Sequence, residues 1–553
     1  MKVNEDQKLE KNNIFSLNEH SFDLFLISLR NLIGNSYLVK CISHINDQEK
    51  LDNQVNIEYT KCFDQMLEEL MIANSIDKNP FYYYLVNSIS KYHNTHICST
   101  KTATFLTILF YKNLKSVVDN NSLSIKLTVK YLRHVLNECI EIVKKNLIKK
   151  IDVKFQNEKF KLVNRHISYN VRQNSEFYKI LLNGVSRLQN KIGDVLYDLL
   201  LMIDDHNLIF NFENIILSSN TVLSSKKLNN LSLNTMNNEE FNYKILKGLA
   251  LKIDNIDNLG CVKYHLKNKS ESFISNALLF ESSLTADFVH LGFNKHLNVN
   301  EIITSNINSN HESEYYYDLW IENVKQLLIS NKISLIFVRD NIDKNLIDFL
   351  KQNFIVHFSN LSLELIKNLK NNYKCSSLIY IEDFKPDKIF KLKICLLNDE
   401  NGSLKLNYLN IQSVNEIEDE IKFTVLFETK LYSLANMYKE YLRHCLKRLH
   451  NILKTSCYLN GSGVVEKYVA ENLKNNQNKM QQDKDQDEIL YYDLITEVYV
   501  KTFREYYTLV TYNNENNTSN INCVDDCFSK FEAWKASCMI NETFLNSDIS
   551  LTY

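Results

Sequence analysis

The chain has 553 residues, of which 44% are hydrophobic and 24% charged, enough apolar material for a large core and for roughly two to four domains. A formal net charge of -2 excludes the strongly basic surface that follows a phosphate backbone, so no nucleic-acid partner is expected. The N-terminal segment "MKVNEDQKLEKNN" lacks the apolar core of a signal peptide, and no later run has the ~18 apolar residues that span a bilayer. We therefore expect a soluble cytoplasmic protein without membrane contact.

The twelve cysteines are scattered along the chain. Cys523 and Cys527, the closest pair, are separated by three residues and have no histidine nearby. This spacing does not favour a zinc site, and we expect no bound metal and reduced, mostly buried thiols.

The N-terminal third has the apolar period of helices. In the segment 126–151, apolar residues recur three and four positions apart and form one stripe on a long predicted helix. The members of this stripe are Leu132, Val135, Leu136, Cys139, Ile140, Val143 and Leu147. A stripe of this width predicts that the helix packs in a helical layer.

The middle of the chain alternates between two periods. The apolar run 332–339 predicts a strand, "NIDKNLIDFLKQN" a helix with Asn341 as its cap, and "FIVHFS" a second strand. "LSLELIKNLKN" then predicts another helix and 377–384 a third strand. Together they indicate a β-α-β-α-β unit around a parallel sheet.

A second long helix is predicted from about Glu428 to Leu453. Leu434, Leu442 and Leu449 belong to its apolar stripe, and their spacing of seven and eight residues predicts that all three are buried. The stripe predicts a second helical layer near the C-terminal end of the chain.

The stretch "YLNGSGVVEKYVAENL" follows this helix and contains Gly461 and Gly463, two of only nine glycines in the chain. A Gly-x-Gly turn at the start of a helix lets backbone amides approach an anion or a nucleotide closely. A plain tight turn explains the same pattern, so both interpretations stay open at this stage.

The order of these segments resembles the group II chaperonins. In that family a helix carrying a His-Asp-Ala-Leu stretch leads to Val-Pro-Gly-Gly-Gly-Ala-Val-Glu, and Val465 and Glu466 match the end of that sequence. "LRNLIGNSYLVKCI" is similar to the family's first nucleotide loop, and Pro80 fits a retained proline ahead of its Gly-Asp-Gly-Thr-Thr motif. The β-α-β-α-β unit corresponds to the family's apical domain.

Within the family the chain looks most like the theta-type subunits of the eukaryotic cytosolic chaperonin TRiC. "CSSLIYIEDF", Phe105 and "VDDCFSKFEAWKASCMINETFLNSD" carry this likeness. The ciliary chaperonin-like proteins share the fold and remain the alternative to exclude.

The resemblance implies a multidomain α and α/β fold in which a helical equatorial domain is split by an intermediate and an apical α/β domain. The implied parts are 1–145 (equatorial, N-terminal), 146–220 (intermediate), 221–375 (apical), 376–427 (intermediate) and 428–553 (equatorial, C-terminal).

The resemblance also implies a site for ATP or ADP with magnesium. Its residues in this sequence would be Gly34, Asn35, Thr100, Thr102, Ala103, Thr104, Gly461, Ser462 and Gly463. Two carboxylates of the family are missing: Lys101 stands where an aspartate binds magnesium, and His444 where an aspartate positions the attacking water. A cation cannot be a magnesium ligand, and the loss of both carboxylates should remove most of the hydrolysis.

Two interpretations of Lys101 remain open, since it either contacts a phosphate and allows binding without turnover, or marks a site no longer in use. The main functional hypothesis is one subunit of a hetero-oligomeric double ring that binds unfolded proteins, together with other chaperonin subunits. The alternative is a chaperonin-like scaffold or assembly factor outside the ring, and a third hypothesis is an unrelated helical protein. Whether the chain is an enzyme stays undecided.

Overall fold

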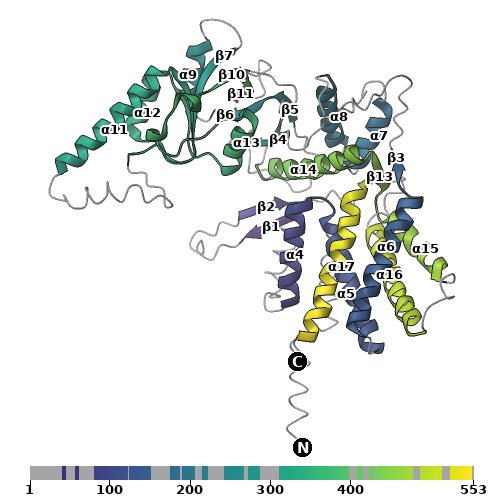
Figure 1. Cartoon of the computed structure of the whole chain (residues 1–553). Helices are drawn as coiled ribbons and strands as arrows, with labels where there is room; N and C mark the ends of the chain where they lie inside the picture. The colour runs from purple at the N-terminus through teal and green to yellow at the C-terminus, as the bar shows by residue number, and fades with distance from the viewer. Residues whose placement is uncertain are drawn as a thin grey trace, which may run out of the picture. The chain divides into compact units, whose positions relative to one another are not determined.

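Figure 1 shows the computed structural model of the chain. The structure describes residues 40–44, 56–60, 80–121, 124–150, 175–186, 190–205, 215–221, 242–253, 255–266, 272–286, 310–397, 408–414, 423–429, 432–477, 486–512 and 523–550. The chain divides into two units, the first made of 1–212, 219–243 and 427–553, and the second of 213–218 and 244–426. The five-part division expected from the sequence is finer than this and stays a prediction.

The first unit is mainly helical. Its helices are α4 (Pro80–His96), α5 (Thr100–Asn121), α6 (Ile125–Asn146), α7 (Ser175–Val185), α8 (Asn190–Asp205), α14 (Tyr432–Thr455), α15 (Val464–Gln477), α16 (Gln486–Tyr512) and α17 (Cys527–Ser550). Its short strands are β1 (Lys40–His44) paired with β2 (Asn56–Thr60), and β14 (Val524–Asp526), β13 (Cys457–Asn460) and β3 (Lys149–Lys150), which form a sheet in that order. The first unit therefore combines segments from both ends of the chain.

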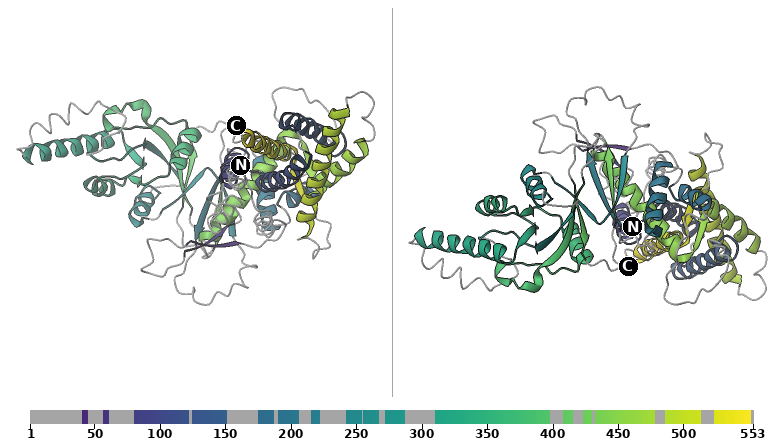
Figure 2. Two further views of the ribbon diagram at one scale, coloured as in Figure 1. Left: turned by 90° about the horizontal axis from the view of Figure 1, so that it is seen from below. Right: turned by 90° about the horizontal axis from the view of Figure 1, so that it is seen from above.

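One apolar core joins α4, α5, α6, α15, α16 and α17, and of these the long helices α5, α6, α16 and α17 lie side by side in Figures 1 and 2. The predicted stripe of α6 is confirmed from Leu132 to Val143, and Leu147 caps the helix end. Aromatic rings fill the centre: Phe110 of α5 and Tyr499 of α16 have centroids 4.6 Å apart, and Phe503 and Trp534 4.9 Å apart. These contacts fix how α16 packs against α5 and α17.

The predicted start of the second long helix is wrong by four residues. Residues 423–429 form strand β12 (Phe423–Thr429), a run rich in apolar and β-branched residues. This strand lies between β4 (Ile215–Thr221) and β5 (Asn242–Lys247) in a three-stranded sheet. Leu442 and Leu449 of α14 are fully buried, as predicted. The side chain of Leu434 lies outside the described residues.

The second unit is built on a six-stranded sheet of order β6–β11–β10–β7–β8–β9. The strands are β6 (Leu249–Lys252), β7 (Ser272–Phe280), β8 (Ile333–Val338), β9 (Val356–Phe358), β10 (Phe390–Leu397) and β11 (Tyr408–Ser413). The helices are α9 (Ile256–Leu266), α11 (Asn310–Ser330), α12 (Lys344–Gln352) and α13 (Leu363–Tyr373). Neighbouring residues of β7 point to opposite faces: Leu279 packs with α9 and α13, and Leu278 with α11 and α12.

This sheet confirms part of the predicted β-α-β-α-β unit and corrects the rest. β8, α12, β9 and α13 are present and β7, β8 and β9 are parallel, but 377–384 is not a strand. Only Leu378 pairs, in an isolated bridge with Phe280, and the chain then turns through a 3-10 helix at Ile381–Asp383. The cap of α12 is Asp343, which accepts a hydrogen bond from the Asn345 amide, and not Asn341.

In the part of the chain that the structure describes, no helix combines the length and the apolar character needed to cross a bilayer.

Candidate functional site

The start of α5 carries four of the residues that the sequence assigns to nucleotide binding. Ile97 and Ser99, both with φ of 63°, turn the chain sharply from α4 into α5. The Thr100 hydroxyl lies 2.9 Å from Nδ1 of His93, and the Thr104 hydroxyl donates to the Thr100 carbonyl. The hydroxyls of Thr100 and Thr104 in this first turn therefore have partners within the protein.

The turn 461–463 follows β13 and opens helix α15, as predicted, and its glycines have a structural explanation. The amide of Gly461 donates to the Cys523 carbonyl at 2.8 Å, and a Cβ placed on Gly461 would lie 3.0 Å from Cβ of Cys523. Gly463 has φ of +77°, a conformation that favours glycine, and a Cβ there would lie 3.3 Å from the Tyr507 ring. The close packing, together with the φ of Gly463, is therefore sufficient to favour glycine at both positions.

His444 of α14 lies beside the connection between α4 and α5. Its ring centroid is 5.4 Å from that of His93, and its carbonyl accepts a hydrogen bond from Sγ of Cys98 at 3.2 Å. Burial lowers the pKa of His444 to about 3, and the electrostatic effects of His93, Arg448 and Lys101 act in the same direction. His444 is therefore neutral at pH 7 in basic surroundings, the opposite of an aspartate that orients water.

Helix α16 connects the two halves of the predicted site. The hydroxyls of Thr102 and Tyr506 are 3.0 Å apart and both residues are buried, while the next residue, Tyr507, packs on Gly463. Two consecutive residues of α16 thus contact the start of α5 and the 461–463 turn, Tyr506 the first and Tyr507 the second. Gly34 and Asn35 lie outside the described residues.

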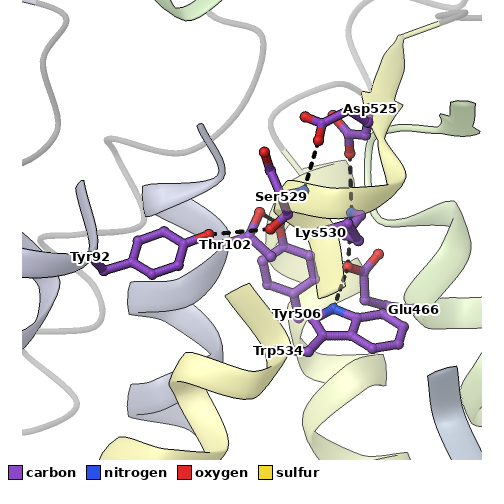
Figure 3. Close-up of polar contacts among 9 residues, drawn as sticks. Tyr92, Thr102, Glu466, Tyr506, Asp525, Ser529, Lys530 and Trp534 are labelled. Atoms are coloured by element: carbon purple, nitrogen blue, oxygen red, sulfur yellow. Dashed lines mark hydrogen bonds and ion pairs between the residues drawn. The ribbon is translucent and has the colours of Figure 1, made fainter. Parts of the chain in front are cut away.

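A buried ion cluster, which no sequence pattern indicated, adjoins this place (Figure 3). Lys530 Nζ lies 2.9 Å from Glu466 Oε1 and 3.1 Å from Asp525 Oδ2, and Trp534 Nε1 donates to the same Glu466 oxygen. Burial would lower the pKa of Lys530, but the carboxylates of Glu466 and Asp525 outweigh burial and raise that pKa, so the lysine stays charged. These four residues are called the Lys530 cluster below.

Asp526, next to the Lys530 cluster, also has internal partners. Its Oδ1 accepts hydrogen bonds from Asn451 Nδ2 at 3.1 Å and from the Ser529 amide at 2.7 Å. The Tyr92 hydroxyl donates to the Ser529 carbonyl, which ties α4 to the start of α17. Both carboxylates of β14 are therefore held by groups of this chain.

Comparison with known proteins addresses the fold directly. A group III chaperonin, crystallised in the open state, superposes with a TM-score of 0.62 over 97% of this chain and 98% of its own, at 11% sequence identity. The chain has the chaperonin fold. The resemblance of the sequence motifs is to group II, and an identity this low shows the fold without choosing between groups.

Sequence comparison is more limited. No family model matches the chain. The human and orangutan (Pongo abelii) proteins named "Chaperonin-containing T-complex member BBS12" are each 37% identical to it over 71 residues, 13% of this chain. The matched part spans only 10% of the length of these relatives, so it carries none of their activity to this chain.

The residues that the resemblance assigns to the magnesium site do not fit that ion. Lys101 is a cation at the start of α5, and His444 is a neutral base. Among the described residues, no three histidine, cysteine or acidic side chains are placed to hold a metal ion together. Asp525 and Asp526 accept from Lys530, Asn451 and Ser529 instead, so these side chains support no step of a magnesium-dependent reaction.

Proposed function

We propose that this chain is a non-hydrolysing subunit of a hetero-oligomeric chaperonin ring and contributes protein contacts to the folding of unfolded clients. The chaperonin fold over nearly the whole chain supports the architecture. The observation that carries the loss of hydrolysis is the pair Lys101 and His444, since a lysine and a neutral histidine stand together where the resemblance implies two carboxylates. The other chaperonin subunits of the ring would supply ATP turnover.

The theta-type assignment is a finer proposal, as is the cytoplasmic location. "VDDCFSKFEAWKASCMINETFLNSD" supports the theta-type assignment, and this segment supplies Asp525, Lys530 and Trp534 of the Lys530 cluster. The curated relatives are named "Chaperonin-containing T-complex member BBS12", a name that does not mention a theta-type subunit. The coarser proposal, a chaperonin-fold chain that assembles with other subunits, does not depend on the theta-type assignment.

Native purification tests the proposal. The tagged full-length chain is expressed in its own cells, and its complexes are separated by size and identified by mass spectrometry. We expect a particle many times the 65.0 kDa of the chain, containing the other chaperonin subunits in equal amounts. A free chain or a small complex without them would overturn the ring proposal.

That second outcome would support the scaffold or assembly factor outside the ring. The internal partners of Lys530, Glu466 and Asp525 fit this alternative as well as they fit a non-hydrolysing ring subunit, so the composition of the purified complex distinguishes the two. Unfolded client proteins would then be absent from the purified complex.

A further inference from the structure

Most of the predicted nucleotide-binding residues lie inside the protein. Of the nine, seven are described, and six of these are buried: Thr100, Thr102, Ala103, Thr104, Gly461 and Gly463. Only Ser462 is half-buried. A phosphate bound at a helix start needs backbone amides and hydroxyls that it can reach. The side chains that bury these residues therefore decide whether a phosphate can bind.

Tyr506 covers the α5 side. The residue is 7% exposed, its hydroxyl lies 3.0 Å from that of Thr102, and Figure 3 shows it beside Lys530. Burial raises the pKa of Tyr506 to about 12, so the phenol keeps its proton and can donate to Thr102 or accept from it. The hydroxyl of Thr102 is thus engaged within the protein.

Tyr507 covers the glycine turn. A Cβ on Gly463 would lie 3.3 Å from Cδ2 of Tyr507 and 3.4 Å from its Cα, so both ring and backbone of α16 rest on the turn. The Lys467 ammonium lies 4.9 Å from the centroid of the same ring and holds it from the α15 side. Cys523 also packs on the turn, since its carbonyl accepts a hydrogen bond from the Gly461 amide at 2.8 Å.

We propose that Tyr506 and Tyr507 fill the space between the start of α5 and the 461–463 turn, so that this chain binds no nucleotide at all. The proposal deepens the proposed function, on which it rests, and decides between the two interpretations of Lys101. Lys101 then marks a site out of use and does not hold a phosphate.

Photoaffinity labelling with an azido-adenine analogue of ATP tests this on the complex as purified, with each chain read separately by mass. On the wild-type chain, we expect no label that is lost when excess ATP competes with the analogue. The double variant Tyr506→Ala/Tyr507→Ala should gain ATP-competed label by about tenfold or more, which corresponds to about 1.4 kcal/mol of binding free energy. Tyr499→Ala is the control, because this tyrosine is also buried and lies about two turns before Tyr506 on the same face of α16, and it should gain no label.

Competed label on the wild-type chain would overturn the proposal and leave the loss of hydrolysis untouched, whereas turnover by this chain would overturn the proposed function itself. A folded double variant without label would also overturn the proposal, since the tyrosines would then not be what excludes nucleotide. Circular dichroism in the near ultraviolet and retention in the complex check folding. If the double variant fails this check, Tyr507→Ala is measured in its place, because Tyr507 is only half-buried.

Discussion

Lys530 shows how one buried charge can connect three elements. The side chain is 1% exposed, and it ties α17 to Glu466 of α15 and to Asp525 of β14. A lysine is rarely buried unless it is paired, so no periodic pattern of apolar residues indicates this contact. The segment "SKFEAWK" stands out only through its resemblance to chaperonins, and partners 64 residues apart in the chain can be found only from the fold.

The first prediction concerns this residue. Lys530→Met should lower the free energy of unfolding by about 3–5 kcal/mol, because Glu466 and Asp525 would remain buried without their counter-charge. Chemical denaturation measures the change. The control is Lys535→Met on the same helix, where an exposed pair with Glu532 should contribute at most about 1 kcal/mol. Equal effects of the two variants would contradict the assignment.

The second prediction concerns pH and His444. Burial lowers the pKa of this histidine from an ordinary 6.5 to about 3 in the folded state, so the unfolded chain binds its proton first on acidification. The stability that a neutral His444 provides is therefore complete above pH 6.5 and is lost as the pH falls towards 3. Thermal unfolding of the protein and of His444→Gln across this window measures it. The two curves should converge towards acid pH, and parallel curves would show that His444 titrates normally.

At the scale of elements, the helices are easier to predict than the strands. The apolar stripe of α6 repeats over several turns and therefore predicts a helix without an alternative, and Leu132, Val135 and Cys139 are buried as the stripe predicts. The runs 377–384 and 423–429 are short and apolar, and only pairing with distant strands decides their state. The first of them forms a single bridge and the second a full strand, a difference that no local pattern contains.

The third prediction belongs to α14. Leu442→Ala should lower the free energy of unfolding by about 2–5 kcal/mol, because the leucine is fully buried and its removal leaves a cavity. Arg443→Ala is the matched control one position along, since its exposed pair with Glu440 should contribute only about 0.5 kcal/mol. Urea denaturation measures both variants. A loss no larger than that of Arg443→Ala would show that Leu442 does not belong to the core.

At the scale of the whole molecule, the order of short matches is sufficient to predict the chaperonin fold, although no one match is long. The same order assigns His444 and Lys101 to one site, and in the structure the charge of Lys101 acts on His444. It does not predict that α16 covers the site, because Tyr506 and Tyr507 look like ordinary members of a helix until Thr102 and Gly463 are found against them. Burial of a site depends on packing between distant segments, which residue patterns do not record.

The fourth prediction is that the chain has no ATPase activity in the complex it forms. Single-turnover hydrolysis is measured in complexes whose other subunits carry disabled sites, and the rate is compared with that of one intact neighbour. Lys101→Asp or His444→Asp alone should restore nothing, because groups that act as one catalytic unit do not contribute additively. The pair Lys101→Asp/His444→Asp should also stay inactive while Tyr506 and Tyr507 cover the site, and should gain turnover only when both tyrosines are replaced by alanine.

A rate from the unmodified chain close to that of the neighbour would overturn the loss of hydrolysis. Turnover by the aspartate pair with both tyrosines in place would instead show that the covered site opens.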